Sequence, residues 1–382
     1  LPPIFLLLTC WLVSQPPQAT DELRILESTA EADFPHRLTF RLSADSDTEI
    51  TDVRLCYHIE RTDFARVISE AYIDFVPDNR ISLDWSLEMI KIGGLPPGSS
   101  MEYWWKVKDS DGKMITTSPS KVDFDDKRYP WESLTEDEVT LYWYQGDQSF
   151  AIDLMQAAQQ ALDRIEQYTA TDLEQPVELF IYASASELQG SMIYPQEWTG
   201  GVAFTRYGIM AIGIAPDNIE WGKRAIAHEL THLVIHQVTL NPYNEIPTWL
   251  DEGLAVRSEG PLSESLSSYL DYAIAEEDFI SVQSLSSPFS AYAGEAALSY
   301  AESYSLVEFL IDTYGEVKMH ELLLTFREGS TYDGALEKVY GFDMDDLDKR
   351  WQEWLMNSSE PDAAPDQLPE QDTTVKQSSE CM

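Results

Sequence analysis

The segment from Trp221 to Gln237 constrains this chain more than any other part of its sequence. Its apolar residues recur at helical spacing around His228, Glu229 and His232, which form the pattern His-Glu-x-x-His. On a helix, residues four positions apart lie one turn apart on the same face, so both histidines can bind one metal ion. Glu229 is rotated by about 100° from His228, which puts its carboxylate next to that ion as a general base. The alternative is a pair of ordinary histidines on an amphipathic helix.

A hydrolytic zinc site needs a third protein ligand, and the segment PTWLDEGLA, Pro247–Ala255, offers an acidic pair. A third histidine six residues after His232 would mark another zinc peptidase pattern, but Val238 stands there. PTWLDEGLA is similar to the WLNEGFA-type segment of gluzincins such as the aminopeptidase N family. The resemblance implies that Glu252 is the third zinc ligand. Asp251 is the alternative, because neighbours on a helix diverge by about 100° and only one can face the metal.

The same resemblance implies a tyrosine on a later helix that hydrogen-bonds the developing oxyanion. In the segment SYAESYSLVEFL, Tyr300 stands at the matching position. A neutral phenol suits this role because its hydrogen bond strengthens as charge develops on the acceptor. Tyr304 and Tyr292 are alternatives, and Tyr300 as a packing or capping residue is the competing interpretation. His236, one turn beyond the motif, is expected to pack beside the site or to support it.

The run from Val202 to Ile214 precedes the motif helix and is expected to be extended. Gluzincins place there an edge strand that pairs with the substrate backbone, and an exposed edge allows a peptide to add as another strand. In the aminopeptidase N pattern, this strand carries Gly-x-Met-Glu-Asn, whose Glu binds the free amine of the substrate. Gly200–Phe204 lacks that Glu, so the sequence favours cleavage of internal bonds.

Residues 21–126 are expected to form a β-sandwich. Polar and apolar residues alternate in Leu38–Leu42 and Val53–Tyr57, which is typical of half-buried strands. Turns at Leu95–Gly98 and Asp109–Gly112 separate further short strands. The segment PPGSSMEYWWKVKDSDG resembles late strands of immunoglobulin- or fibronectin-like modules. Its aromatic residues are interpreted as sandwich core, with a carbohydrate or peptide platform as the alternative.

Residues 127–357 are expected to form an α+β domain, because strands at Val139–Trp143 and Val177–Tyr182 are followed mainly by helical patterns. This part resembles the peptidase MA-like gluzincin domains of exported bacterial and archaeal proteins, which implies a thermolysin-like zinc peptidase fold with a helical C-terminal half. Residues 358–382 are polar, acidic and rich in proline, and are expected to be a disordered tail.

The composition limits location and partners. The chain has 25 Lys and Arg against 67 Asp and Glu, a net charge of −42, which argues against nucleic-acid binding. Residues 1–19 have the apolar run and the following Pro-rich stretch of a secretory signal. Outside them the sequence contains no stretch that resembles a membrane helix. The three cysteines cannot form a disulfide framework. We therefore expect a secreted or cell-surface protein.

From these features we expect a Zn²⁺-dependent metallopeptidase that acts on peptides or proteins, and the missing amine-binding Glu favours an endopeptidase. Metal ligands are expected at His228, His232 and Glu252, and catalytic residues at Glu229 and Tyr300; no other cofactor is indicated. The alternative functions are a zinc-binding hydrolase that does not cut peptides, or a catalytically idle extracellular binding protein. The oligomeric state is left open.

Overall fold

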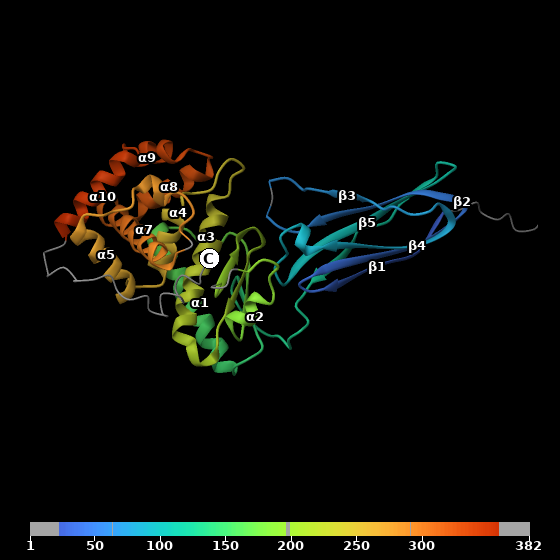
Figure 1. Ribbon diagram of the computed structural model, residues 1–382, viewed down its shortest axis with the longest axis horizontal. Helices are drawn as coiled ribbons and strands as arrows, with labels where there is room; N and C mark the ends of the chain where they lie inside the picture. The colour runs from blue at the N-terminus through green and yellow to red at the C-terminus, as the bar shows by residue number, and fades with distance from the viewer. Residues whose placement is uncertain (1–22, 63, 196–198, 291, 359–382) are drawn as a thin grey trace, which may run out of the picture.

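The computed structural model describes residues 23–62, 64–195, 199–290 and 292–358. The expected signal segment, residues 1–19, lies outside this range. So does the expected tail, residues 358–382, apart from Ser358, the last residue of a helix. Figure 1 shows an elongated β-rich part on one side of the molecule and a helical part on the other, with a smaller sheet between them.

The N-terminal part is one seven-stranded sheet, here called the N-terminal sheet, whose strand pairs are all antiparallel. Along β5 buried and partly exposed residues alternate, and the rings of Tyr103 and Trp105 point into the core. This confirms the interpretation as core residues for Tyr103 and Trp105, whereas Trp104 between them is partly exposed and belongs to no described core cluster. The strands are β1 Arg24–Asp33, β2 Arg37–Ile59, β3 Ser69–Tyr72, β4 Asp78–Glu88, β5 Ser99–Asp109, β6 Met114–Thr116 and β7 Ser120–Phe124.

The two strands expected at 38–42 and 53–57 are parts of one strand, β2, and their separation was wrong. The first half of β2 pairs with β1 and β4, and the second half pairs with β3 and β5. A register shift between Asp45 and Ile50 lets the strand continue through a polar stretch. The N-terminal part is therefore β-rich as expected, while its assignment to the immunoglobulin or fibronectin type stays a prediction.

The second sheet, here called the central sheet, has the strand order β11-β12-β10-β9-β8. Its three inner strands are parallel, and the edge strands β8 and β11 are antiparallel to their neighbours. The run expected to be extended from 202 to 214 is interrupted by a short 3-10 turn at Thr205–Tyr207. The strands are β8 Glu132–Glu136, β9 Val139–Trp143, β10 Val177–Tyr182, β11 Gly201–Phe204 and β12 Ile209–Gly213.

Helices cover one face of the central sheet and continue into a bundle (Figure 1). Leu141, Leu179 and Ile212 of the sheet pack with apolar residues of α1 and α3 in one core cluster. The later helices enclose a second cluster around Trp249 and Trp351. Among the described helices, none combines the length and the apolar content needed to cross a membrane. The helices are α1 Gln148–Thr169, α2 Ala185–Gln189, α3 Ile219–Thr239, α4 Thr248–Ser258, α5 Glu264–Glu276, α6 Val282–Leu285, α7 Ala293–Tyr314, α8 Glu316–Arg327, α9 Tyr332–Tyr340 and α10 Met344–Ser358.

Candidate metal centre

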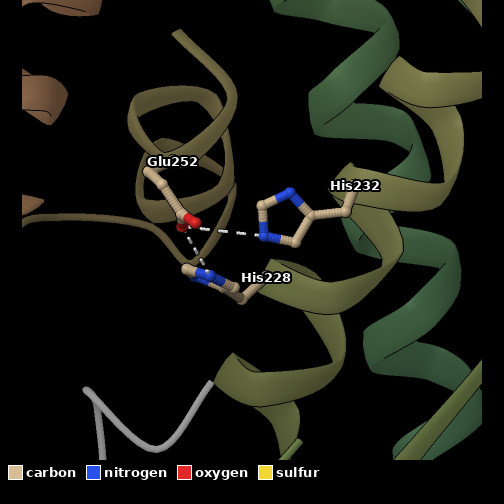
Figure 2. Close-up of side chains that lie close together, drawn as sticks. All are labelled: His228, His232 and Glu252. Atoms are coloured by element: carbon tan, nitrogen blue, oxygen red, sulfur yellow. Dashed lines mark ion pairs between the residues drawn. The ribbon is translucent and has the colours of Figure 1, made fainter. Parts of the chain in front are cut away.

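The predicted ligands come from two packed helices, α3 and α4. Figure 2 shows the carboxylate of Glu252 on α4 pointing toward the imidazoles of His228 and His232 on α3. One Glu252 oxygen, Oε2, lies 3.3 Å from Nε2 of His228 and 3.7 Å from Nε2 of His232. All three residues are buried. Although they come from two separate motifs, their ligand atoms lie within 4.8 Å of one another, so they can hold one ion.

The other nitrogen of each motif histidine contacts a carboxylate. Nδ1 of His228 lies 2.9 Å from Glu259, and Nδ1 of His232 lies 3.0 Å from Asp251. An ionised carboxylate can only accept a hydrogen bond, so both Nδ1 atoms donate and both Nε2 atoms carry a free electron pair in the neutral ring. This arrangement is common for histidines that bind metals, because it fixes the tautomer and the ring orientation.

These donors fit a zinc ion. Two neutral imidazole nitrogens and one carboxylate oxygen are a common ligand set for catalytic zinc. Nε2 of His228 and Oε2 of Glu252 are buried and neither makes a hydrogen bond within the described part of the chain. Buried polar atoms usually have such a partner, and a bound cation would satisfy both atoms.

The charge balance of the cluster also favours a cation. Burial lowers the pKa of both motif histidines, but the neighbouring carboxylates outweigh burial. Glu252 and Glu259 raise the pKa of His228 well above its usual value, and Asp251 and Glu252 raise that of His232 to about 9. Without metal, the cluster therefore binds protons, and a zinc ion would replace them.

Two carboxylates in this cluster support the histidines. Glu259 also accepts hydrogen bonds from Arg224, at 2.9 and 3.1 Å, which orients it toward His228. Asp251 lies between two histidines, since its second oxygen is 3.0 Å from Nε2 of His236. Asp251, the alternative third ligand, thus faces Nδ1 of His232, on the side away from Glu252. His236 supports Asp251, as its place one turn beyond the motif suggested.

Glu259 was not predicted as a site residue from the sequence. It follows Glu252 by seven residues, two helical turns, and so continues the same face of α4. That spacing was the available signal. His232, His236 and Asp251 also lie close enough to share an ion. However, each of these histidines is at hydrogen-bond distance from its own oxygen of Asp251, so this group is satisfied by protons alone.

Strand β11 passes directly beside Glu229. A Cβ atom added to Gly201 would lie only 2.9 Å from Oε1 of Glu229, so a larger residue would displace the carboxylate. Glu229 itself is buried on α3. The edge strand of the central sheet and the acidic residue of the motif therefore meet at one point.

Tyr300 lies on α7 at the other side of the motif. Its ring is buried, and its centroid is 6.3 Å from that of His228 and 5.2 Å from that of Phe289. Of its two alternatives, Tyr292 is 75% exposed, and Tyr304 packs in the same apolar cluster as Tyr300. Helices α4 and α7 come very close, since a Cβ atom on Gly253 would meet the carbonyl oxygen of Ser303 at 2.3 Å.

Three comparisons with known proteins were made, and the match to a family model agrees with the motif. The family model of the Peptidase MA superfamily matches residues 157–357, more than half of the chain. A search of curated proteins found no match. Among solved structures, the M1 zinc metallopeptidase from Deinococcus radiodurans is 11% identical; the match covers 90% of this chain and 96% of that one, with a TM-score of 0.36. A bromine derivative of BhCBM56 is 12% identical over 25% of this chain and 88% of that one, with a TM-score of 0.19. The family match confirms the resemblance found in the motifs: the chain belongs to the Peptidase MA superfamily.

Proposed function

We propose that the protein is a zinc-dependent peptidase in which His228, His232 and Glu252 hold the metal. The observation that carries this proposal is the convergence of two histidine Nε2 atoms on Glu252, while each Nδ1 atom is held by a separate carboxylate. Membership of the Peptidase MA superfamily supports the same activity.

Zinc bound by these residues would supply a Lewis acid and lower the pKa of water to about 7. Glu229 accepts the proton of the attacking water and passes it to the leaving amine nitrogen. Its burial beside Gly201 excludes bulk solvent from this transfer. Tyr300 donates a hydrogen bond to the oxyanion that forms from the substrate carbonyl. Its edge contact with His228 supports this role.

The substrate backbone is proposed to pair with β11. This strand is at the edge of the central sheet and passes beside Glu229, so a peptide added to it would run along the catalytic residues. Gly200–Phe204 contains no acidic residue that could bind a free amino terminus. We therefore propose an endopeptidase that cuts internal bonds.

The proposal also covers the two domains and the export of the protein from the cell. We propose a β-sandwich domain of the immunoglobulin or fibronectin type at 21–126 and a thermolysin-like peptidase domain at 127–357. The last strand of the N-terminal sheet ends at Phe124 and the central sheet begins at Glu132, which supports a boundary between them. Export with removal of residues 1–19 is also proposed. Sequencing the amino terminus of mature protein tests it, and retention of these residues would contradict it.

The central test combines metal analysis with digestion of an unbiased peptide library. The parent is expected to bind one zinc ion and to cut internal bonds. Glu252→Ala should lose the zinc, whereas Glu353→Ala, at an exposed position on α10, should keep it. Stoichiometric zinc in Glu252→Ala would assign the third ligand elsewhere, first to Asp251. A parent that holds zinc but leaves every peptide intact would point to a hydrolase of another kind.

A further inference from the structure

The face of the central sheet away from α1 and α3 carries a second cleft, which has no part in the mechanism above. Its cavity volume is about 530 Å³. One wall is a turn of the N-terminal sheet at Gly98, where a Cβ atom would lie 2.9 Å from both Glu178 and Phe180. We call this space the acidic aromatic cleft. It is lined chiefly by Asp125, Tyr129, Trp131, Tyr142, Glu178 and Phe180.

The aromatic rings form a continuous packed layer. Tyr142 stacks on Phe180 with ring centroids 4.7 Å apart, and Trp131 meets Phe180 edge-on at 5.5 Å. The indole N–H of Trp131 donates to the backbone oxygen of Asp126 at 2.7 Å. These contacts fix the rings before any ligand arrives. Fixed aromatic walls are typical of sites for sugars, for apolar groups and for cations.

The carboxylates in the cleft favour a cation over a sugar or an apolar group. Burial raises the pKa of Glu178 and of Asp125, and their mutual proximity raises that of Glu178 further. Glu178 accepts a hydrogen bond from Tyr142 at 3.2 Å and has no ion pair with any described residue. Lys127, at the exposed rim, only partly offsets the effect on Asp125. A partly buried carboxylate such as Glu178 is costly without a cation, and the exposed Asp125 adds a second negative charge at the same cleft.

The cleft also lies near the path proposed for the substrate. Glu178 on β10 is level with Ile209 on β12, which is level with Phe204 on β11. Two strand spacings, about 10 Å, thus separate Glu178 from the edge strand. Gly201, at the other end of β11, is the residue beside Glu229. A peptide paired with β11 would lie one strand spacing further away, about 14 Å from Glu178, which is more than a lysine side chain spans. A substrate side chain would therefore reach the cleft where the peptide leaves β11 and passes over this face of the sheet.

We propose that the acidic aromatic cleft binds the cationic side chain of a lysine or arginine in the substrate polypeptide. Glu178 and Asp125 would pair with the charge, and the aromatic rings would pack along the aliphatic stem and the cationic head. The identity of the occupant rests on the proposed peptidase function. Binding of a cationic side chain is independent of that function, because the cleft and the metal centre lie on opposite faces of the central sheet.

The test is a double-mutant cycle between peptide and protein. Short peptides that carry a single lysine at successive positions are compared with the same peptides carrying norleucine. Binding is measured by fluorescence anisotropy in full-length protein with Glu229→Gln, which prevents cleavage. At one or two positions lysine should bind about tenfold more tightly than norleucine, the factor expected from a charge-assisted contact. Glu178→Gln should abolish the difference, while Glu353→Gln, with the same change in charge, should keep it.

A second variant controls for misfolding caused by a change at the partly buried Glu178. Asp125 is exposed at the cleft, so Asp125→Asn should fold and reduce the lysine preference severalfold. No lysine preference, or a preference that survives Glu178→Gln, would overturn the proposal. So would a neutral oligosaccharide that binds through Trp131 and is insensitive to Glu178→Gln. A lysine preference in a protein that cuts no peptide would support the cleft and contradict the peptidase function, so the two failures are distinguishable.

Discussion

The two faces of the central sheet differ in how their carboxylates are compensated. On the helix side, Glu259 and Asp251 each contact a histidine, and Glu259 also pairs with Arg224. On the other side, Glu178 and Asp125 have no ion pair with any residue in the described part of the chain. A carboxylate paired with a cationic side chain holds that side chain in position, whereas an unpaired carboxylate can still bind a cation from outside the protein. Glu259 and Asp251 therefore support the metal centre, whereas Glu178 and Asp125 are themselves available to bind a ligand.

Glu302 on α7 is a third type of carboxylate, one that is buried without an ion pair to any described residue. It is fully buried and accepts hydrogen bonds from the backbone N–H of Ile280, at 3.2 and 3.3 Å. Burial raises its pKa to about 8, with a further increase from Asp348 and Asp278. Glu302 is therefore neutral at moderate pH and needs no cation. Protonation, rather than an ion pair, removes its negative charge.

The strongest test of the helix side is Glu229→Gln. This change keeps the shape of the side chain but removes its ability to accept a proton. Turnover should fall by about 10²–10⁴, the usual contribution of general-base catalysis, while zinc content stays at the parent level. Turnover within about tenfold of the parent would refute the role.

Tyr300→Phe should have the next largest effect. It removes one hydroxyl, and loss of an oxyanion donor typically lowers turnover by about 10²–10³. Zinc content should not change, which separates this defect from loss of a ligand. Tyr304→Phe is the matched control and should be nearly silent. Full activity of Tyr300→Phe would transfer the role to Tyr304, to Tyr292 or to another group.

Glu302→Gln tests the carboxylate that is compensated by a proton. Because the pKa is about 8 in the folded chain and near 4.5 when unfolded, the folded state binds more protons between these values. The free energy of unfolding of the parent should therefore fall as pH rises from 4.5 to 8, with about 4 kcal/mol from this group. The variant should lack this component and be the more stable protein at pH 8. Urea denaturation at pH 5 and pH 8 measures it, and equal pH dependence in both proteins would contradict it.

Glu259→Gln should have the smallest effect of the four. The amide can no longer fix His228 and Arg224 as the carboxylate does, and loss of such a partner typically costs about 10–100-fold in metal affinity or activity. Competition with a zinc chelator measures the affinity, with Glu353→Gln as the charge-matched control. Unchanged affinity and activity would reduce the contact with His228 to simple packing.

The helices that carry His228, Glu252 and Tyr300 were predicted from the sequence because their signals are local: helical spacing, short motifs and a helix that starts after Pro247. Contacts between distant segments gave no such signal. Neither the approach of Gly201 to Glu229 nor that of Gly98 to Glu178 can be inferred from spacing.

The polar stretch within β2 separated the two strands expected at 38–42 and 53–57, but pairing with partners on both sides keeps it extended, so tertiary context overrode the local pattern. The break between β11 and β12 did have a local signal in Gly208, whose φ is +65°.

The close approach of Gly253 to Ser303 has a consequence for biosynthesis. A chain emerges from the ribosome with its amino-terminal end first, and domains tend to fold in that order. The His-Glu-x-x-His helix is therefore made well before α7, against which the backbone of α4 rests. Until α7 is in place, α4 lacks its most extensive packing partner, and we expect a nascent chain to hold metal only loosely. We expect metal to be acquired after translation has passed Tyr314, so a truncated chain would be an inactive and metal-poor product.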